Sequence, residues 1–140
     1  MATALFSSHP EAEVIEIEFQ TLSGQHRRVP LLVDSGFTGE SDLILSIDEC
    51  ELTWTPISAV QTTGALQGQQ IRVVVMGRVS GLSVDAPLLA ILTDLSQLTL
   101  PVGVNGMVGL SFLRRFARWG AERRADGQWQ FFLTESDPPA

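Results

Sequence analysis

Short apolar segments separated by turn residues follow one another along nearly the whole chain. In residues 13–20, Ile15, Ile17 and Phe19 alternate with glutamate and glutamine, as in a strand with one buried face. Later segments are rich in valine, isoleucine and leucine, and turn residues recur about every eight to twelve positions. Segments this short and this closely spaced favour strands over helices. The sequence therefore predicts a mainly β fold, a compact barrel or sandwich with one or two short helices.

Individual strands can be placed from this pattern. We expect them over residues 13–20, 27–33, 42–46, 54–62, 70–76, 78–84, 88–92, 117–125 and 128–134. Asp126-Gly127 between the last two strands indicates a two-residue hairpin turn. Ser46 and Ser111 are positioned to cap short helices over residues 47–52 and 111–116.

The length of 140 residues and the hydrophobic content of 44% predict one domain with a well-formed core. We expect this domain to span residues 13–134. A flexible segment over residues 1–12 is expected before it, and a disordered tail over residues 135–140 after it. The formal net charge of −7 argues against general binding to nucleic acid, because contact with the phosphate backbone needs clustered positive charge.

All nine cationic side chains are arginines, and five of them lie close together in the sequence. These five are Arg114, Arg115, Arg118, Arg123 and Arg124. We interpret the cluster as a solvated rim or as a set of ion pairs with the acidic strand near the N-terminus. The alternative is contact with nucleic acid or another acidic partner, which requires all five side chains to be exposed on one face.

The sequence shows little sign of a bound cofactor, a bound metal or a membrane-spanning segment. The single cysteine, Cys50, cannot form an internal disulfide and has no partner at metal-ligand spacing, which fits a reducing compartment. No cluster of histidine and carboxylate residues suggests a metal, so we expect no metal and no cofactor. No secretory signal and no apolar run of membrane-spanning length is visible, so we expect a cytoplasmic protein without membrane contact.

One carboxylate stands at an unusual place. An apolar run over residues 31–33 leads straight into Asp34-Ser35-Gly36, and Phe37, Thr38 and Gly39 follow. An ionised carboxylate beside a buried strand is costly unless it accepts hydrogen bonds or its protonation changes. Ser35 and the glycines supply hydroxyl and backbone N–H donors nearby. Asp34 is therefore a candidate catalytic residue; the alternative is an ordinary turn aspartate that accepts its own backbone N–H groups.

A second short motif lies far along the chain. Met107, Val108 and Gly109 combine two apolar residues with a glycine, directly before the predicted helix. Together with Asp34-Ser35-Gly36-Phe37-Thr38-Gly39, this motif resembles the retropepsin-like aspartic proteases (clan AA). It is particularly similar to their small bacterial and archaeal members, whose motif reads Asp-Thr-Gly-Phe-Thr-Gly. The order of the motifs and the hairpin between them also agree, over roughly residues 14–133. The resemblance implies a closed barrel of the retropepsin-like, or acid protease, type.

The resemblance also implies an activity, peptide-bond hydrolysis by two carboxylates that share one proton around a water molecule. Two adjacent carboxylates cannot both ionise cheaply, so such a pair titrates as a unit. The chain has only one Asp turn of this kind, so the enzyme is expected to be a homodimer with Asp34 from each subunit. Ser35, Gly36 and Thr38 are then active-site support. The Ser35 hydroxyl is expected to hydrogen-bond across the dimer axis, and Met107, Val108 and Gly109 are structural in either interpretation.

The segment between the two motifs is expected to close over a peptide or protein substrate. Its predicted flap tip is Gly64, Ala65, Leu66, Gln67 and Gly68, which would pair main chain to main chain with an extended peptide. The two glycines are equally well explained as simple hairpin turn residues. The alternative function is that of a catalytically inactive retropepsin-like module for dimerisation or peptide binding, with the same fold but without peptide hydrolysis.

Overall fold

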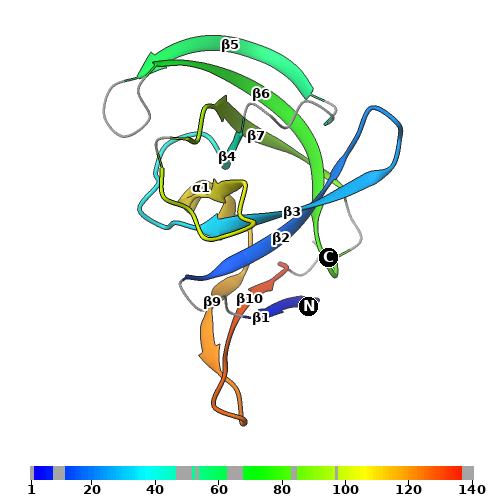
Figure 1. Cartoon of the computed structure of the whole chain (residues 1–140). Coiled ribbons are helices and arrows are strands. Elements are labelled where there is room, and N and C mark those ends of the chain that lie inside the picture. The colour runs from blue at the N-terminus through cyan, green and yellow to red at the C-terminus, as the bar shows by residue number, and fades with distance from the viewer. Residues whose placement is uncertain are drawn as a thin grey trace.

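The computed structural model describes residues 2–7, 12–46, 52, 54–62, 68–82, 85–96 and 98–136, and Figure 1 shows the whole chain. Ten strands and one short helix account for the regular structure of this part of the chain. They are β1 (Thr3–Ser7), β2 (Val14–Gln20), β3 (His26–Val33), β4 (Leu43–Ser46), β5 (Trp54–Thr62), β6 (Gly68–Val79), β7 (Ala86–Thr93), β8 (Gly106–Val108), α1 (Leu110–Leu113), β9 (Arg118–Arg123) and β10 (Trp129–Thr134).

Six of the strands form a closed β-barrel in the order β2-β3-β8-β4-β7-β6, and pairing between β6 and β2 closes it. The β3–β8 and β4–β7 pairs are parallel, and the other pairs are antiparallel. At the closure, Phe19 lies opposite Gly77. A Cβ atom at position 77 would come within 2.9 Å of the Phe19 ring, so a glycine lets the two strands approach there. The predicted mainly β class and the barrel are confirmed.

The barrel interior is filled by the alternating residues that the sequence marks. Ile15, Ile17 and Phe19 of β2 are completely buried, and Val29 and Leu31 of β3 join them. The apolar residues of β4, β6 and β7 complete this core. Burying one such side chain contributes roughly 1.5–3 kcal/mol, so the alternating pattern fixes which face of each strand turns inward.

A second sheet joins the two ends of the described chain, with the order β1-β10-β9. Thr3 lies opposite Thr134, and their hydroxyls are 3.0 Å apart. The expectation of a flexible segment over residues 1–12 is therefore wrong for β1. Past β10, the backbone N–H of Glu135 donates to the Ala2 carbonyl, so the expectation of disorder is wrong for Glu135. Residues 137–140 lie outside the described part.

The hairpin between β9 and β10 has a loop one residue longer than predicted. The Arg124 N–H donates to the Gln128 carbonyl, and the Gly127 N–H donates to the Arg124 carbonyl. Gly127 has a φ of +87°, and the Gln128 N–H donates to the Asp126 side chain at 2.9 Å. A turn followed by a left-handed glycine is the usual three-residue hairpin loop.

Of two further predictions, the strand over residues 78–84 is wrong, and the helical turn over residues 47–52 lies mostly outside the described residues. A separate strand was expected over residues 78–84, but β6 continues to Val79 and the chain then turns, with Gly81 at a φ of +95°. The expected helical turn over residues 47–52 has only Leu52 inside the described part, where it forms an isolated bridge with Thr21. No helix in the described part of the chain has the length and apolar character needed to cross a membrane.

Asp85, the residue before β7, connects β7 to the turn between β2 and β3. The Gln20 side-chain amide donates to its carboxylate at 3.2 Å, and the His26 Nε2 lies 3.1 Å from it. Burial by itself raises the pKa of Asp85, but the hydrogen bonds with Gln20 and His26 and the charges of His26 and Arg78 outweigh it. The pKa of Asp85 is therefore held below its ordinary value of 3.8.

This lowered pKa makes stability depend on pH. Because the folded-state pKa is the lower one, the stabilisation is fully present above the unfolded pKa of 3.8 and is lost as pH falls through the folded-state pKa. We expect Asp85→Asn to lower the free energy of unfolding at neutral pH, with the difference from wild type disappearing in acid. Urea unfolding from about pH 7 to pH 2 measures this. A difference that stays constant over that range would contradict the role given to the Asp85 charge.

Candidate functional site

Asp34 is the first residue after β3, and its backbone continues the pairing of β3 with β8. Its N–H donates to the Val108 carbonyl at 3.0 Å. Its side chain is half-buried and accepts a hydrogen bond at Oδ1 from the Gly36 N–H, also at 3.0 Å. The Phe37 N–H donates to the Asp34 carbonyl and closes the turn. An ordinary turn aspartate makes the same contacts, so they fix the direction of the carboxylate without deciding its chemistry.

The two motifs that lie far apart in the sequence are in direct contact. Met107 and Val108 are buried in β8, which is inserted between β3 and β4. The Leu110 N–H donates to the Phe37 carbonyl at 2.9 Å, and the Ser111 hydroxyl donates to the Gly39 carbonyl at 2.5 Å. Together with the bond from the Asp34 N–H to the Val108 carbonyl, these two bonds hold the turn after Asp34 at three points against β8 and α1. The chain folds this way because β8 can satisfy its backbone groups only by pairing with both neighbours.

Gly109 is required by the close packing of these two segments. A Cβ atom at position 109 would overlap the Phe37 ring and lie 2.8 Å from the Phe37 carbonyl oxygen. Gly109 is also the N-cap of α1, without a side-chain hydrogen bond. The prediction that Ser111 caps this helix is therefore wrong: α1 begins one residue earlier, and the Ser111 hydroxyl bonds the Asp34 turn instead.

The other predicted support residues lie beside the carboxylate. Ser35, Gly36 and Thr38 are exposed in the single chain. A Cβ atom at position 36 would be 3.2 Å from Asp34 Oδ1, so a glycine there leaves the carboxylate room to accept the N–H bond. Within the described residues, the Ser35 hydroxyl has no hydrogen-bond partner.

A second aspartate close to the site was not recognised as functional from the sequence. The Asp42 side chain is only 4% exposed. It accepts hydrogen bonds from the Leu89 N–H at 2.9 Å and from Arg115 Nε and an Arg115 terminal nitrogen at 3.0 and 2.8 Å. The Asp42 carbonyl in turn accepts the Gly109 N–H. This ion pair connects the segment after α1 to the residue before β4, and the Leu89 N–H connects the same carboxylate to β7. The only sequence signal was an aspartate directly before a short apolar strand.

The arginine cluster does not form a single basic face. Arg115 pairs with Asp42, and Arg124 lies 3.3 Å from Asp126. Arg118 stacks over the Phe132 ring at 5.4 Å, on the face of β9 opposite to Arg123. Because Arg118 and Arg123 lie on opposite faces of β9, the five side chains are not all exposed on one face. In the acidic strand, Glu16 pairs with Arg28, and Glu18 lies close to Arg28 and Arg78, neither of which belongs to the cluster.

The predicted flap belongs to the hairpin of β5 and β6. Figure 1 shows this hairpin arching over the barrel, with its far end on the same side of the view as the loop that follows β3. Gly68 is the first residue of β6. The other predicted tip residues, Gly64, Ala65, Leu66 and Gln67, lie outside the described part of the chain, as does Cys50.

The described residues include no group of three or more histidine, cysteine, aspartate or glutamate side chains placed to hold a metal ion. At the Asp34 turn itself, the polar groups are a carboxylate, a neighbouring hydroxyl and backbone N–H groups. A scan of the sequence against models of known protein families finds no match, and a search among curated proteins finds none either.

Proposed function

We propose that this protein is a retropepsin-like aspartic endopeptidase that acts as a homodimer. One observation carries the proposal: a half-buried carboxylate at the end of a barrel strand, in a turn fixed at three points by β8 and α1. Positioning of this kind is what a catalytic acid or base needs, because a misplaced group loses much of its effect. The exposed Ser35 and Gly36 leave one side of the turn open to a second subunit.

The proposed reaction uses Asp34 from each subunit. The ionised carboxylate takes a proton from a water molecule, whose oxygen attacks the peptide carbonyl carbon. The protonated carboxyl group gives its proton to the carbonyl oxygen, and a tetrahedral intermediate forms. When the C–N bond breaks, the protonated carboxyl group gives its proton to the amine nitrogen, and the ionised carboxylate takes a proton from a hydroxyl of the intermediate, so the pair again holds one proton. In this proposal the Ser35 hydroxyl, which has no hydrogen-bond partner within the described residues, joins the two turns across the dimer axis.

A second candidate function is a dimerisation or peptide-binding module without catalysis. It is favoured by the Gly36 N–H, which already satisfies Asp34 Oδ1 within one chain. In this candidate, the turn is structural and the free edge of β5 in the described hairpin accepts a peptide strand.

Dimerisation separates the two candidates from an isolated barrel. We expect sedimentation at micromolar concentration to show a dimer, and a diverse peptide library to be cleaved between about pH 4 and pH 6. A statine-type transition-state analogue should inhibit that cleavage, since such compounds bind more tightly than substrates. The Ser35→Thr variant is the matched control and should remain a dimer with activity. A strict monomer would overturn the proposed enzyme, and a dimer that cleaves no peptide would favour the binding module.

A further inference from the structure

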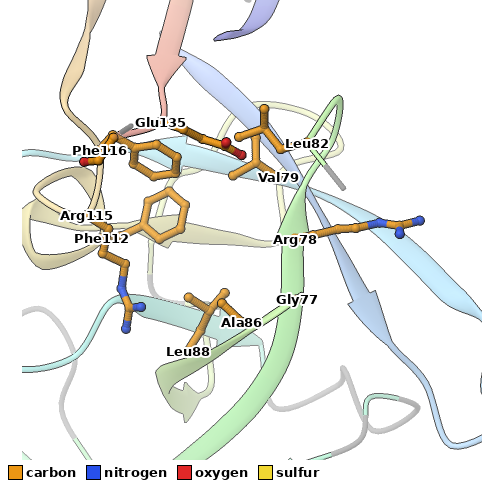
Figure 2. A pocket seen from close by; sticks show the side chains of 11 residues that line it. Gly77, Arg78, Val79, Leu82, Ala86, Leu88, Phe112, Arg115, Phe116 and Glu135 are labelled. Carbon is orange, nitrogen blue, oxygen red and sulfur yellow. The ribbon is translucent and has the colours of Figure 1, made fainter. Parts of the chain in front are cut away.

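A cavity of about 310 Å³ lies away from the Asp34 turn, with none of residues 34–39 in its lining. Its apolar walls come from β6 and the turn after it, from β7, and from α1 and the residues that follow it. The side chains are Val79, Leu82, Ala86, Leu88, Phe112 and Phe116. Figure 2 shows these side chains turned toward a common space. The volume is about twice that of an engineered cavity of roughly 150 Å³ that holds benzene, so a small organic molecule fits.

One acidic side chain faces this space. Glu135 lies across the edge of the cavity between Phe116 and Val79, with its carboxylate directed toward the apolar walls (Figure 2). Its backbone N–H donates to the Ala2 carbonyl at 2.9 Å, which holds the residue at the end of the β1–β10 pair. The side chain is half-buried and, within the described residues, has no ion-pair partner.

Both arginines that border the cavity are engaged elsewhere. Arg78 Nε lies 3.3 Å from Glu18, and its guanidinium group points away from the cavity in Figure 2. Arg115 is bound to Asp42. The unneutralised charge at the cavity is therefore negative. Phe112 and Phe116 meet edge to face, with ring centroids 5.3 Å apart, and aromatic groups next to a carboxylate also attract cations.

We propose that this cavity binds a small amine with an aromatic or branched apolar body, whose ammonium group pairs with Glu135. The apolar body occupies the space between the two phenylalanines and the side chains of β6 and β7. A mainly apolar pocket with one convergent charged group is the usual form of a small-molecule site. This inference is independent of the proposed peptidase activity, because no residue of the Asp34 turn takes part.

An NMR titration of the isotope-labelled full chain tests the proposal with three probes of similar size. The probes are 2-phenylethylamine, the neutral 2-phenylethanol and the anionic 3-phenylpropanoate. We expect saturable shifts at the amides of Gly77, Leu82 and Phe116, with the amine binding about threefold to fivefold more tightly than the alcohol and the anion weakest. Glu135→Gln should reduce the affinity for the amine to that for the alcohol, and Ala86→Leu should weaken all three by filling the cavity.

The matched control is Glu122→Gln, an exposed glutamate on β9 outside the cavity lining. It changes the net charge by the same amount and should leave the affinity for the amine unchanged. The proposal is overturned if no probe gives saturable shifts, or if the anion binds as well as the amine. Equal loss of amine affinity in the Glu122 and Glu135 variants would also overturn it, because the attraction would then come from the overall charge of −7.

Discussion

We expect the replacement of Asp34 by asparagine to abolish the proposed peptide cleavage and to leave the fold and the proposed dimer intact. Asparagine keeps the size of the side chain and can still accept the Gly36 N–H, which is 3.0 Å from Asp34 Oδ1. It can neither take a proton from water nor share one with a second carboxylate. We expect the rate of cleavage to fall by at least about 10²–10⁴-fold, the range that general acid–base catalysis contributes.

Three measurements together check this prediction: peptide cleavage, sedimentation and thermal unfolding. Glu40→Gln is the matched control, because Glu40 is an exposed carboxylate in the same loop. Its cleavage rate should remain close to that of wild type. Robust cleavage by the purified Asp34→Asn protein would rule out the proposed mechanism. A loss of cleavage accompanied by unfolding or dissociation would instead assign Asp34 a structural role.

The largest expected effect on stability comes from breaking the ion pair between Asp42 and Arg115. In Arg115→Met, the Asp42 carboxylate, which is 4% exposed, keeps the Leu89 N–H as its only donor among the described residues. Removing one partner of a buried pair costs about 3–5 kcal/mol, and because the Arg115 side chain is 42% exposed we expect about 2–3 kcal/mol. For a chain of 140 residues this lowers Tm by roughly 10 °C.

A double-mutant cycle with Asp42→Asn separates the pair from its surroundings. If the two side chains act through each other, the double variant is less destabilised than the sum of the single variants. The control is Arg114→Met, an exposed neighbour whose removal should change the free energy of unfolding by less than about 0.5 kcal/mol. Additive effects of Arg115→Met and Asp42→Asn would show that the contact between them contributes little.

The strands of the barrel follow from local patterns. In β2, every second residue is apolar, and a strand with this pattern can bury only one face. The same reasoning locates β3, β4 and the hairpin of β5 and β6. Where a prediction fails, the local signal was weak or ambiguous. Asp126-Gly127 fits both a two-residue and a three-residue loop, and the choice depends on how Arg124 and Gln128 pair. Likewise, Thr3–Ser7 has a partner only because β10 returns beside it.

In the candidate site, too, some features were visible in the sequence and others were not. The Asp34 turn and the motif around Gly109 were visible in the sequence, since a carboxylate after an apolar strand and a glycine before a helix each need a local reason. The contact between the Asp34 turn and the Gly109 motif was not visible in the sequence, and neither was the ion pair between Asp42 and Arg115. Both partners of that ion pair carry ordinary local signals, and only the packing of α1 beside β4 brings them within 2.8 Å.

The sequence by itself thus determined the class of fold, the buried face of β2 and the position of the single Asp turn. These depend on periodicity and on residues within a few positions of one another. The tertiary structure alone decided the closure of the barrel, the β1–β10 sheet, the dispersal of the arginines and the apolar cavity beside Glu135. Each of these depends on contacts between residues distant in sequence, where many partners are chemically equivalent and only the chain path selects among them.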